Sequence, residues 1–146
     1  MLYPLQKNSA LFFLLLISFF SCKTNQKAES TVKLQNKVWV LKELYSTPVV
    51  FSSDAKKVEL RFGVNDFNGS GGCNNMNGLY VIKEDMIKIQ SVMSTKMACE
   101  NAKYEADFFK MLEQCNKYSL KTITSGSSSK KQLVLLLDEK VLAILE

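Results

Sequence analysis

A short segment rich in glycine and asparagine, Gly69–Gly78, contains Cys73, one of four cysteines in the chain, and Cys99 follows a little later. A glycine-rich loop of this kind can cradle a phosphate with its backbone N–H groups. The phosphate-binding P-loop, however, ends in Gly-Lys-Ser/Thr and opens a helix, and this segment does neither. Glycine and asparagine also tolerate left-handed backbone conformations and allow backbones to approach closely. We therefore expect Gly69–Gly78 to serve tight turns and close backbone approach rather than a phosphate site.

The candidate catalytic groups are few, because the chain has no histidine. This removes the commonest general base and the commonest metal ligand. Glu105 shares an apolar face of a predicted helix, and a buried carboxylate there must find hydrogen-bond donors. It could serve as a general base with a raised pKa, or it could accept N–H groups of the glycine/asparagine turns and lock the helix to the rest of the fold. We expect the second role, since no nucleophile–base set accompanies Glu105. Asn74 is interpreted as an Asx-turn residue and Thr95 as a local backbone cap.

The cysteines predict one disulfide. The predicted helix between Cys99 and Cys115 disfavours a bridge between them, because 16 residues at helical rise separate the two by roughly 24 Å, whereas bridged Cα atoms lie within about 7 Å. Cys73–Cys99 is the better pair, since it joins the turn segment to the loop before the helix. Its closed loop predicts a contribution of about 3–4 kcal/mol. Cys115 is then a free thiol on the buried face of the helix.

The N-terminus is typical of an exported chain. Ala10–Phe20 (ALFFLLLISFF) is apolar and has the length of a signal-peptide h-region. Cys22, which follows a small residue at the end of this run, resembles the lipidated cysteine of bacterial lipoproteins; ordinary secretion with an incidental Cys22 is the alternative. The residues after Cys22 are polar and cannot bury enough surface to order themselves. We predict a signal peptide over residues 1–21, a flexible tether over 22–34 and one domain over 35–146.

The charge balance argues against nucleic acid as a partner. The chain has 19 Lys and Arg against 14 Asp and Glu, a formal net charge of +5. The basic residues are scattered, without a run of five and without interleaved aromatic residues. A solvated surface, with mild attraction to anionic headgroups, is the better interpretation.

The elements that would position these residues are mostly strands. Alternating or β-branched runs predict strands, and an uninterrupted amphipathic stretch predicts a helix over 100–114. The predicted strands are Lys37–Leu44, Val58–Phe62, Leu79–Ile82, Met86–Ile89, Tyr118–Thr124, Gln132–Leu137 and Val141–Leu145. Because one helix cannot cover both faces of so many strands, we predict a mainly β fold, an open or closed antiparallel barrel with one packed helix.

Several separated motifs together resemble the META/HslJ-like domain family. They are Trp39 in a Trp-x-Leu strand, Gly72-Cys73-Asn74, Gly78, Thr95-x-Met97-Ala98-Cys99, and Glu105 on the following helix. The resemblance runs from about Trp39 to Glu146 and implies a lipocalin-like barrel. It also implies a secreted or lipid-anchored bacterial protein associated with envelope stress, with no defined biochemical activity.

These observations lead to three functional hypotheses. The first is a non-enzymatic, monomeric lipoprotein of the cell envelope, without metal or cofactor, with a binding or structural role. It would be held through Cys22 to a membrane, the outer one being favoured, and would face the periplasm or the surface, where its partner would be an envelope protein or an apolar ligand. The second is a carrier or chaperone for a small apolar ligand or lipid inside the barrel, lined by residues such as Phe62, Met86 and Met97. The third is an enzyme that uses Glu105 or Cys115.

Overall fold

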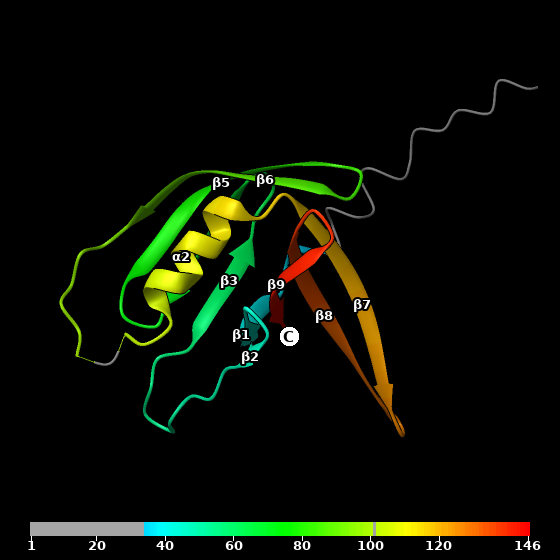
Figure 1. The fold of residues 1–146 in the computed structure, drawn as a ribbon, viewed down its shortest axis with the longest axis horizontal. Coiled ribbons are helices and arrows are strands. Elements are labelled where there is room, and N and C mark those ends of the chain that lie inside the picture. Colours follow the sequence, from blue (N-terminus) through cyan, green and yellow to red (C-terminus); the bar gives the residue numbers. More distant parts are fainter. Residues whose placement is uncertain (1–33, 101) are drawn as a thin grey trace, which may run out of the picture.

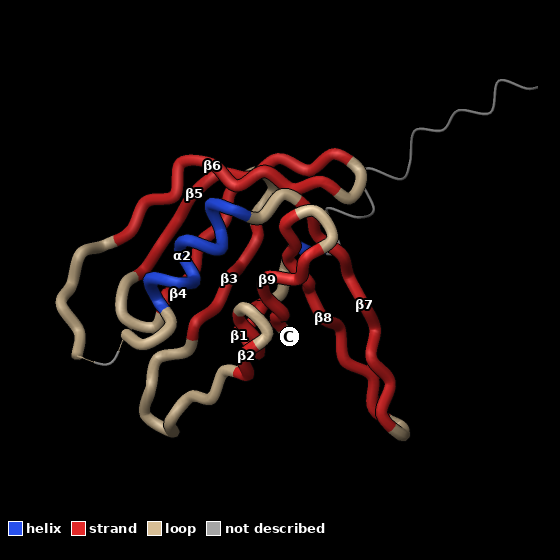
Figure 2. The backbone as a smooth tube through the Cα atoms, in the orientation of Figure 1, coloured by secondary structure: helices blue, strands red, loops and turns tan. Residues whose placement is uncertain are grey.

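The computed structural model describes residues 34–100 and 102–146, and this part of the chain forms one antiparallel sheet of nine strands with one helix (Figures 1 and 2). The predicted signal peptide, Cys22 and nearly all of the predicted tether lie outside the described residues. The strands and the helix are β1 Val38–Leu44, β2 Thr47–Pro48, β3 Val58–Phe62, β4 Asp66–Gly71, β5 Asn75–Lys83, β6 Met86–Ser94, α2 Glu105–Gln114, β7 Lys117–Ser125, β8 Ser128–Leu137 and β9 Lys140–Leu145.

The sheet is curled into a ring, which confirms the predicted barrel. Its strand order is β2-β1-β3-β4-β5-β6-β7-β8-β9, and β1 also pairs with β9 through Leu41↔Leu145 and Leu44↔Ala143. Between β6 and β7 the pairing is limited to Met86↔Lys117. The helix α2 packs against β4 and β6 and lies across the opening of the curved sheet (Figure 1).

The burial of each strand follows its sequence pattern. β5 alternates exposed and buried residues along its whole length, as a strand with one face on the core does. The apolar run of β8 behaves differently, because Leu133, Val134 and Leu135 are all buried in succession. Both faces of the sheet are therefore covered at this point, as uninterrupted apolar runs predict.

Large side chains fill the interior. Trp39, Phe67 and Phe108 are among the largest fully buried residues, and Phe108 enters from α2. The indole Nε1 of Trp39 donates a hydrogen bond to the carbonyl oxygen of Leu34 at 2.9 Å, and Leu34 is itself fully buried. The packed domain thus includes Leu34, one residue before the predicted boundary at 35.

The helix is shorter than predicted. It begins at Glu105, whereas the sequence pattern predicted a start near Glu100. The cause is tertiary: Cys99 is bonded to Cys73, and the backbone of Met97 is hydrogen-bonded to Asn74. These contacts hold Met97 and Cys99 against the β4–β5 turn, ahead of the helix.

The glycine/asparagine segment is mostly strand rather than turn. β4 runs to Gly71 and β5 starts at Asn75, so only Gly72–Asn74 form the connection. At Gly69 a Cβ would collide with the carbonyl oxygen of Glu59 on the neighbouring strand. The glycine therefore serves close strand approach, which was expected along with tight turns, and the turn itself is limited to residues 72–74.

No helix in the described part of the chain has the length and apolar character required to cross a bilayer.

Candidate functional site

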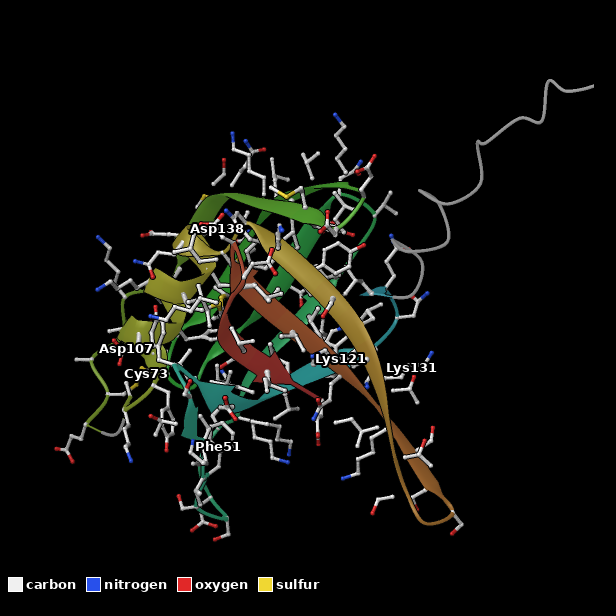
Figure 3. All side chains as sticks on the ribbon, turned by 45° about the vertical axis from the view of Figure 1, so that its right-hand side comes forward. Phe51, Cys73, Asp107, Lys121, Lys131 and Asp138 are labelled. Atoms are coloured by element: carbon white, nitrogen blue, oxygen red, sulfur yellow. A yellow bond between two sulfur atoms is a disulfide. The ribbon has the colours of Figure 1, made fainter. Side chains whose placement is uncertain are left out.

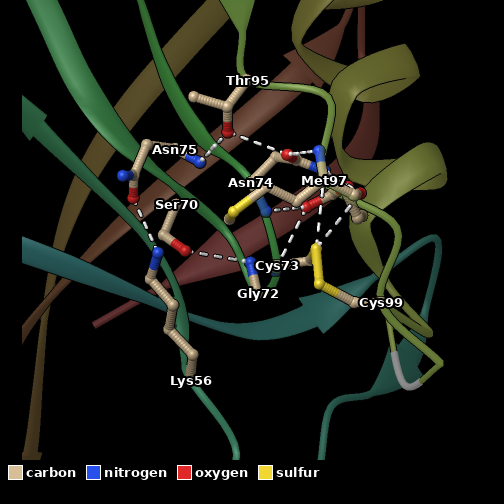
Figure 4. Close-up of a disulfide and its surroundings, with 10 residues drawn as sticks. Lys56, Ser70, Gly72, Cys73, Asn74, Asn75, Thr95, Met97 and Cys99 are labelled. Carbon is tan, nitrogen blue, oxygen red and sulfur yellow. Dashed lines mark hydrogen bonds between the residues drawn. A yellow bond between two sulfur atoms is a disulfide. The ribbon is translucent and has the colours of Figure 1, made fainter.

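The β4–β5 turn, the segment before α2 and the first turn of α2 meet in one polar cluster (Figure 4). A disulfide joins Cys73 to Cys99 across 26 residues of sequence, with their Cα atoms 6.1 Å apart. This is the pairing predicted from the sequence. We call the cluster the clasp, and it consists of Cys73, Asn74, Thr95, Met97, Cys99 and Glu105.

Glu105 is the anionic centre of the clasp. Its Oε2 accepts the backbone N–H groups of Cys73 at 3.1 Å and Asn74 at 2.6 Å, and its Oε1 accepts Asn74 Nδ2 at 2.7 Å. Burial raises the pKa of Glu105, but the hydrogen bonds from Asn74 and Cys73 and the positive charge of Lys56 outweigh it, so the pKa lies below its usual value. The carboxylate is ionised at neutral pH and locks α2 to the turn, the role expected from the sequence. A carboxylate of this pKa is a poor general base, and it occupies the N–H groups that a bound phosphate would need.

The turn geometry admits Glu105 because two glycines precede Cys73. A Cβ on Gly71 would lie 2.7 Å from Cγ and Oε2 of Glu105, so a side chain there would displace the carboxylate. Gly72 has φ +103°, a left-handed conformation that strains other residues. Its N–H donates to Ser70 Oγ at 3.0 Å, which satisfies the remaining donor of the turn.

Asn74 is the hub of the clasp rather than the Asx-turn residue predicted. It is buried, and its side-chain amide both donates and accepts hydrogen bonds. Nδ2 donates to Glu105 Oε1 and to the carbonyl oxygen of Met97 at 3.2 Å, while Oδ1 accepts Thr95 Oγ1 at 2.8 Å and Met97 N–H at 2.7 Å. This uses both donors and both acceptor positions of the amide. Its partners lie more than 20 residues away, which local sequence rules cannot anticipate.

Thr95 and Met97 also act over long range. Thr95 Oγ1 accepts the N–H of Asn75 at 3.2 Å and donates to Asn74, so it ties the segment to β5 instead of capping its own loop. Met97 contributes only its backbone to the clasp, because its side chain is 54% exposed. The Met97 side chain therefore does not line the interior of the barrel, where the carrier hypothesis placed it, and Met86, 41% exposed, departs from that expectation in the same way.

The other motif residues, Trp39 and Gly78, serve the core. Trp39 is fully buried, with the Nζ of Lys37 4.1 Å from its ring centroid. At Gly78 a Cβ would lie 2.6 Å from the ring of Phe67. The residues of the sequence motif thus divide into a clasp group and a packing group.

Cys115 is a buried thiol of low reactivity. It is buried at the end of α2, is unpaired among the described cysteines, and its Sγ lies 3.5 Å from the carbonyl oxygen of Leu112. Burial raises its pKa to about 12, which suppresses the nucleophilic thiolate at neutral pH.

An open cleft of about 720 Å³ lies beside the clasp, and no motif in the sequence predicted it. Phe51 and Tyr104 meet in it edge to face, with ring centroids 5.8 Å apart. Lys56, Lys103 and Cys73 also line it, and Figure 3 shows Phe51 and Cys73 on the same side of the molecule. The only sequence signal was an aromatic residue in each of two loops.

Few polar groups around the clasp remain available to react or to bind a metal ion. Every buried side-chain nitrogen or oxygen among the described residues has a hydrogen-bond partner. Within residues 34–100 and 102–146, no three Cys, Asp or Glu side chains form a group that could hold a metal ion. The site thus offers a rigid polar support and an adjoining cleft, with an aromatic pair and two lysines along its wall.

The ring of antiparallel strands, the single helix across its opening and the clasp that fixes this helix define a small β-barrel domain. The chain belongs to the META domain family, which matches residues 32–146. Its fold is similar to that of a protein from Burkholderia xenovorans determined by NMR, with 21% identity, a TM-score of 0.61, and coverage of 81% of this chain and 86% of the other. A second NMR structure is similar at 22% identity, with a TM-score of 0.54 and coverage of 79% and 92%. A comparison with curated proteins found no significant match.

Proposed function

We propose that this META domain is a non-enzymatic binding module of the bacterial cell envelope, carried on a lipid at Cys22, and that it binds its partner at the cleft beside the clasp. The observation that carries the proposal is the contrast between the clasp and the cleft. The polar groups of the clasp are hydrogen-bonded to one another, whereas the cleft next to it is open and presents aromatic and charged side chains. Binding is the activity that such a surface supports.

The chemistry of the candidate catalytic residues favours a non-enzymatic role. Glu105 has a lowered pKa and three hydrogen-bond donors, and Cys115 is buried with a raised pKa. Neither group has the exposed, tuned character of a catalytic base or nucleophile.

The packed interior weighs against a carrier that holds its ligand inside the barrel. Trp39, Phe67, Phe108 and Met111 occupy the space that a lipid would need. A surface ligand with an apolar group and a polar end suits the structure better, because Phe51 and Tyr104 lie beside Lys56 and Lys103 in the cleft. The partner that fits this cleft is an envelope protein that presents a side chain with an apolar group and a polar end. A role in envelope stress, implied by the family resemblance, is part of the same proposal.

The cleft can be tested with the amphipathic dye 1-anilinonaphthalene-8-sulfonate and purified protein. We expect Phe51→Ala to weaken dye binding by about tenfold, because it removes half of the aromatic pair. Val64→Ala is the matched control, since Val64 is 70% exposed and lies outside the cleft. Circular dichroism verifies that both variants are folded, and equal dye binding by wild type and Phe51→Ala would contradict the cleft as the binding site.

The anchor can be tested separately by mass spectrometry of the protein isolated from its own cells without reductant. We expect a mature chain that begins at a lipidated Cys22 and contains the Cys73–Cys99 disulfide. A mature chain with an unmodified Cys22, or one cleaved elsewhere, would refute the lipoprotein assignment.

A further inference from the structure

The hairpin of β7 and β8 extends away from the barrel as a two-stranded arm (Figure 1). We define the arm as residues 121–131, all of which are exposed. Its strands remain paired out to Ser125↔Ser128, although β7 has left β6 after one pair at Lys117. Because an isolated two-stranded ribbon gains little stability from itself, such an arm is usually supported by a further contact.

The arm carries positive charge with little to balance it. Residues 117–137 include four lysines and no Asp or Glu. Lys117, at the base, is paired with Glu139 at 2.7 Å, and the partly exposed Glu146 lies 3.9 Å from Lys130. Lys121 and Lys131 have no acidic partner among the described residues, and Figure 3 shows both on the strands that lead to the tip of the arm.

One face of the arm combines two charges with an apolar centre. Directly opposite residues of an antiparallel pair project to the same face, so the pairs Ile123↔Lys130 and Lys121↔Gln132 share one face. Ile123 is 44% exposed between the two lysines. This pattern fits a surface with anionic groups at its edge and an apolar layer beneath them.

The base of the arm lies where the described chain begins. The Nζ of Lys37 donates to the carbonyl oxygen of Lys131 at 3.2 Å, and Lys37 follows closely after Leu34, the first described residue. Burial, and then the charge of Lys131, lower the pKa of Lys37, as expected for two neighbouring cations. The eleven residues between Cys22 and Leu34 could span at most roughly 40 Å. A domain held at Cys22 would therefore keep the arm within reach of the bilayer.

We propose that the arm docks on the surface of an anionic lipid bilayer, with Lys121 and Lys130 at the headgroups and Ile123 in the interface. The proposal relies on the envelope location proposed above for access to a bilayer, but it requires neither lipid on Cys22 nor a ligand in the cleft. Each lysine near an anionic membrane surface strengthens binding by about fivefold. The contact would orient the domain on the membrane, which a lipid anchor alone does not do.

The test is vesicle co-sedimentation of the chain from residue 22 onward with Cys22→Ser, so that no lipid anchor contributes. We expect binding to phosphatidylglycerol-containing vesicles and not to phosphatidylcholine vesicles, and weaker binding as salt rises. Lys121→Gln with Lys130→Gln should lower the partition coefficient by about 25-fold. The control pair Lys88→Gln with Lys110→Gln removes the same net charge from β6 and α2, outside the arm, and should change it by less than about threefold.

A second variant separates a bilayer from a soluble polyanion. Ile123→Ser should weaken vesicle binding while leaving binding to heparin unchanged, because only a bilayer offers an apolar layer. Equal losses for the arm pair and the control pair would overturn the proposal, as would binding to heparin without binding to anionic vesicles. Since the anchor is absent from this protein, failure here leaves the test of Cys22 by mass spectrometry unaffected.

Discussion

The clasp and the arm are two polar regions of the same sheet, and they are ordered by opposite means. The clasp is held by a disulfide and by hydrogen bonds from residues distant in sequence, which converge on Asn74 and Glu105. The arm is held by its own cross-strand ladder, with every residue from 121 to 131 exposed.

The difference shows where stability and where adaptability lie in this domain. Removal of a partner from a buried polar network leaves other groups without hydrogen bonds, so each part of the clasp is sensitive to change. Substitutions in the arm leave water to take over the lost contacts. The arm can therefore vary its surface chemistry without endangering the fold. Four variants test this difference between the two regions.

The largest loss should follow Glu105→Ala. It leaves the N–H groups of Cys73 and Asn74 and the Asn74 amide without their acceptor, and we expect about 4 kcal/mol less free energy of unfolding. Urea denaturation measures it, with Glu113→Ala as the control on an exposed position of the same helix. If both variants unfolded at the same urea concentration as wild type, α2 would not be locked by Glu105.

Loss of the disulfide should have a slightly smaller effect. Cys73→Ser with Cys99→Ser releases a loop of 26 residues, which corresponds to about 3.5 kcal/mol on the chain-entropy description. Thermal unfolding with and without reductant measures the difference, and the double variant should no longer respond to reductant. A response that persisted in the double variant would mean that another thiol, such as Cys115, controls the effect.

Acid should weaken the clasp through Glu105. Its pKa is lowered in the folded protein, so the stability that it contributes is complete above the pKa of the unfolded chain, about 4.3, and is lost as pH falls through the folded value. Glu105→Gln should remove this part of the pH dependence while leaving the other carboxylates to titrate. Urea midpoints at neutral and acidic pH test this, and parallel pH profiles for the two proteins would rule it out.

The smallest effect should come from the arm. Ile123→Ala removes a partly exposed side chain that the barrel does not cover, and we expect a change below about 0.5 kcal/mol. Native-state hydrogen exchange should show faster exchange at Thr122–Thr124 than at Tyr80–Ile82 in β5. Similar protection in the two hairpins would mean that the arm is supported by the barrel after all.

The fold could be predicted where burial follows a simple period. The alternation in Val58–Phe62 predicted β3, and the apolar stripe of Phe108, Met111 and Leu112 predicted the body of α2. The Cys73–Cys99 pairing was predicted by counting cysteines and by placing a helix between Cys99 and Cys115, although that helix begins only at Glu105. The alternation of β3 and the stripe of α2 use only local periodicity, which tertiary contacts did not overrule there.

The prediction failed where distant residues decide local structure. The disulfide and Met97 tie the segment before α2 to the β4–β5 turn, and the role of Asn74 depends on partners in α2 and in the segment between β6 and α2. The strand through Gly69 requires the approach of Glu59, which no residue count reveals. The role of Glu105 could be predicted, because an inward-facing carboxylate is stable only where hydrogen-bond donors are present. The glycine/asparagine segment was the expected source of those donors.

The pairing of β1 with β9 sets the order in which this domain can be completed. Leu41 lies opposite Leu145, so the ring closes between residues that are about a hundred positions apart. During synthesis from the N-terminus, the β3–β6 meander can form early. The pairing of β1 with β9 can form only after β9 has been made. Final closure is therefore late, and a chain shortened by its last strand would leave Leu41 and Leu44 facing water. Such a chain should collect as an aggregation-prone intermediate rather than as a smaller stable domain.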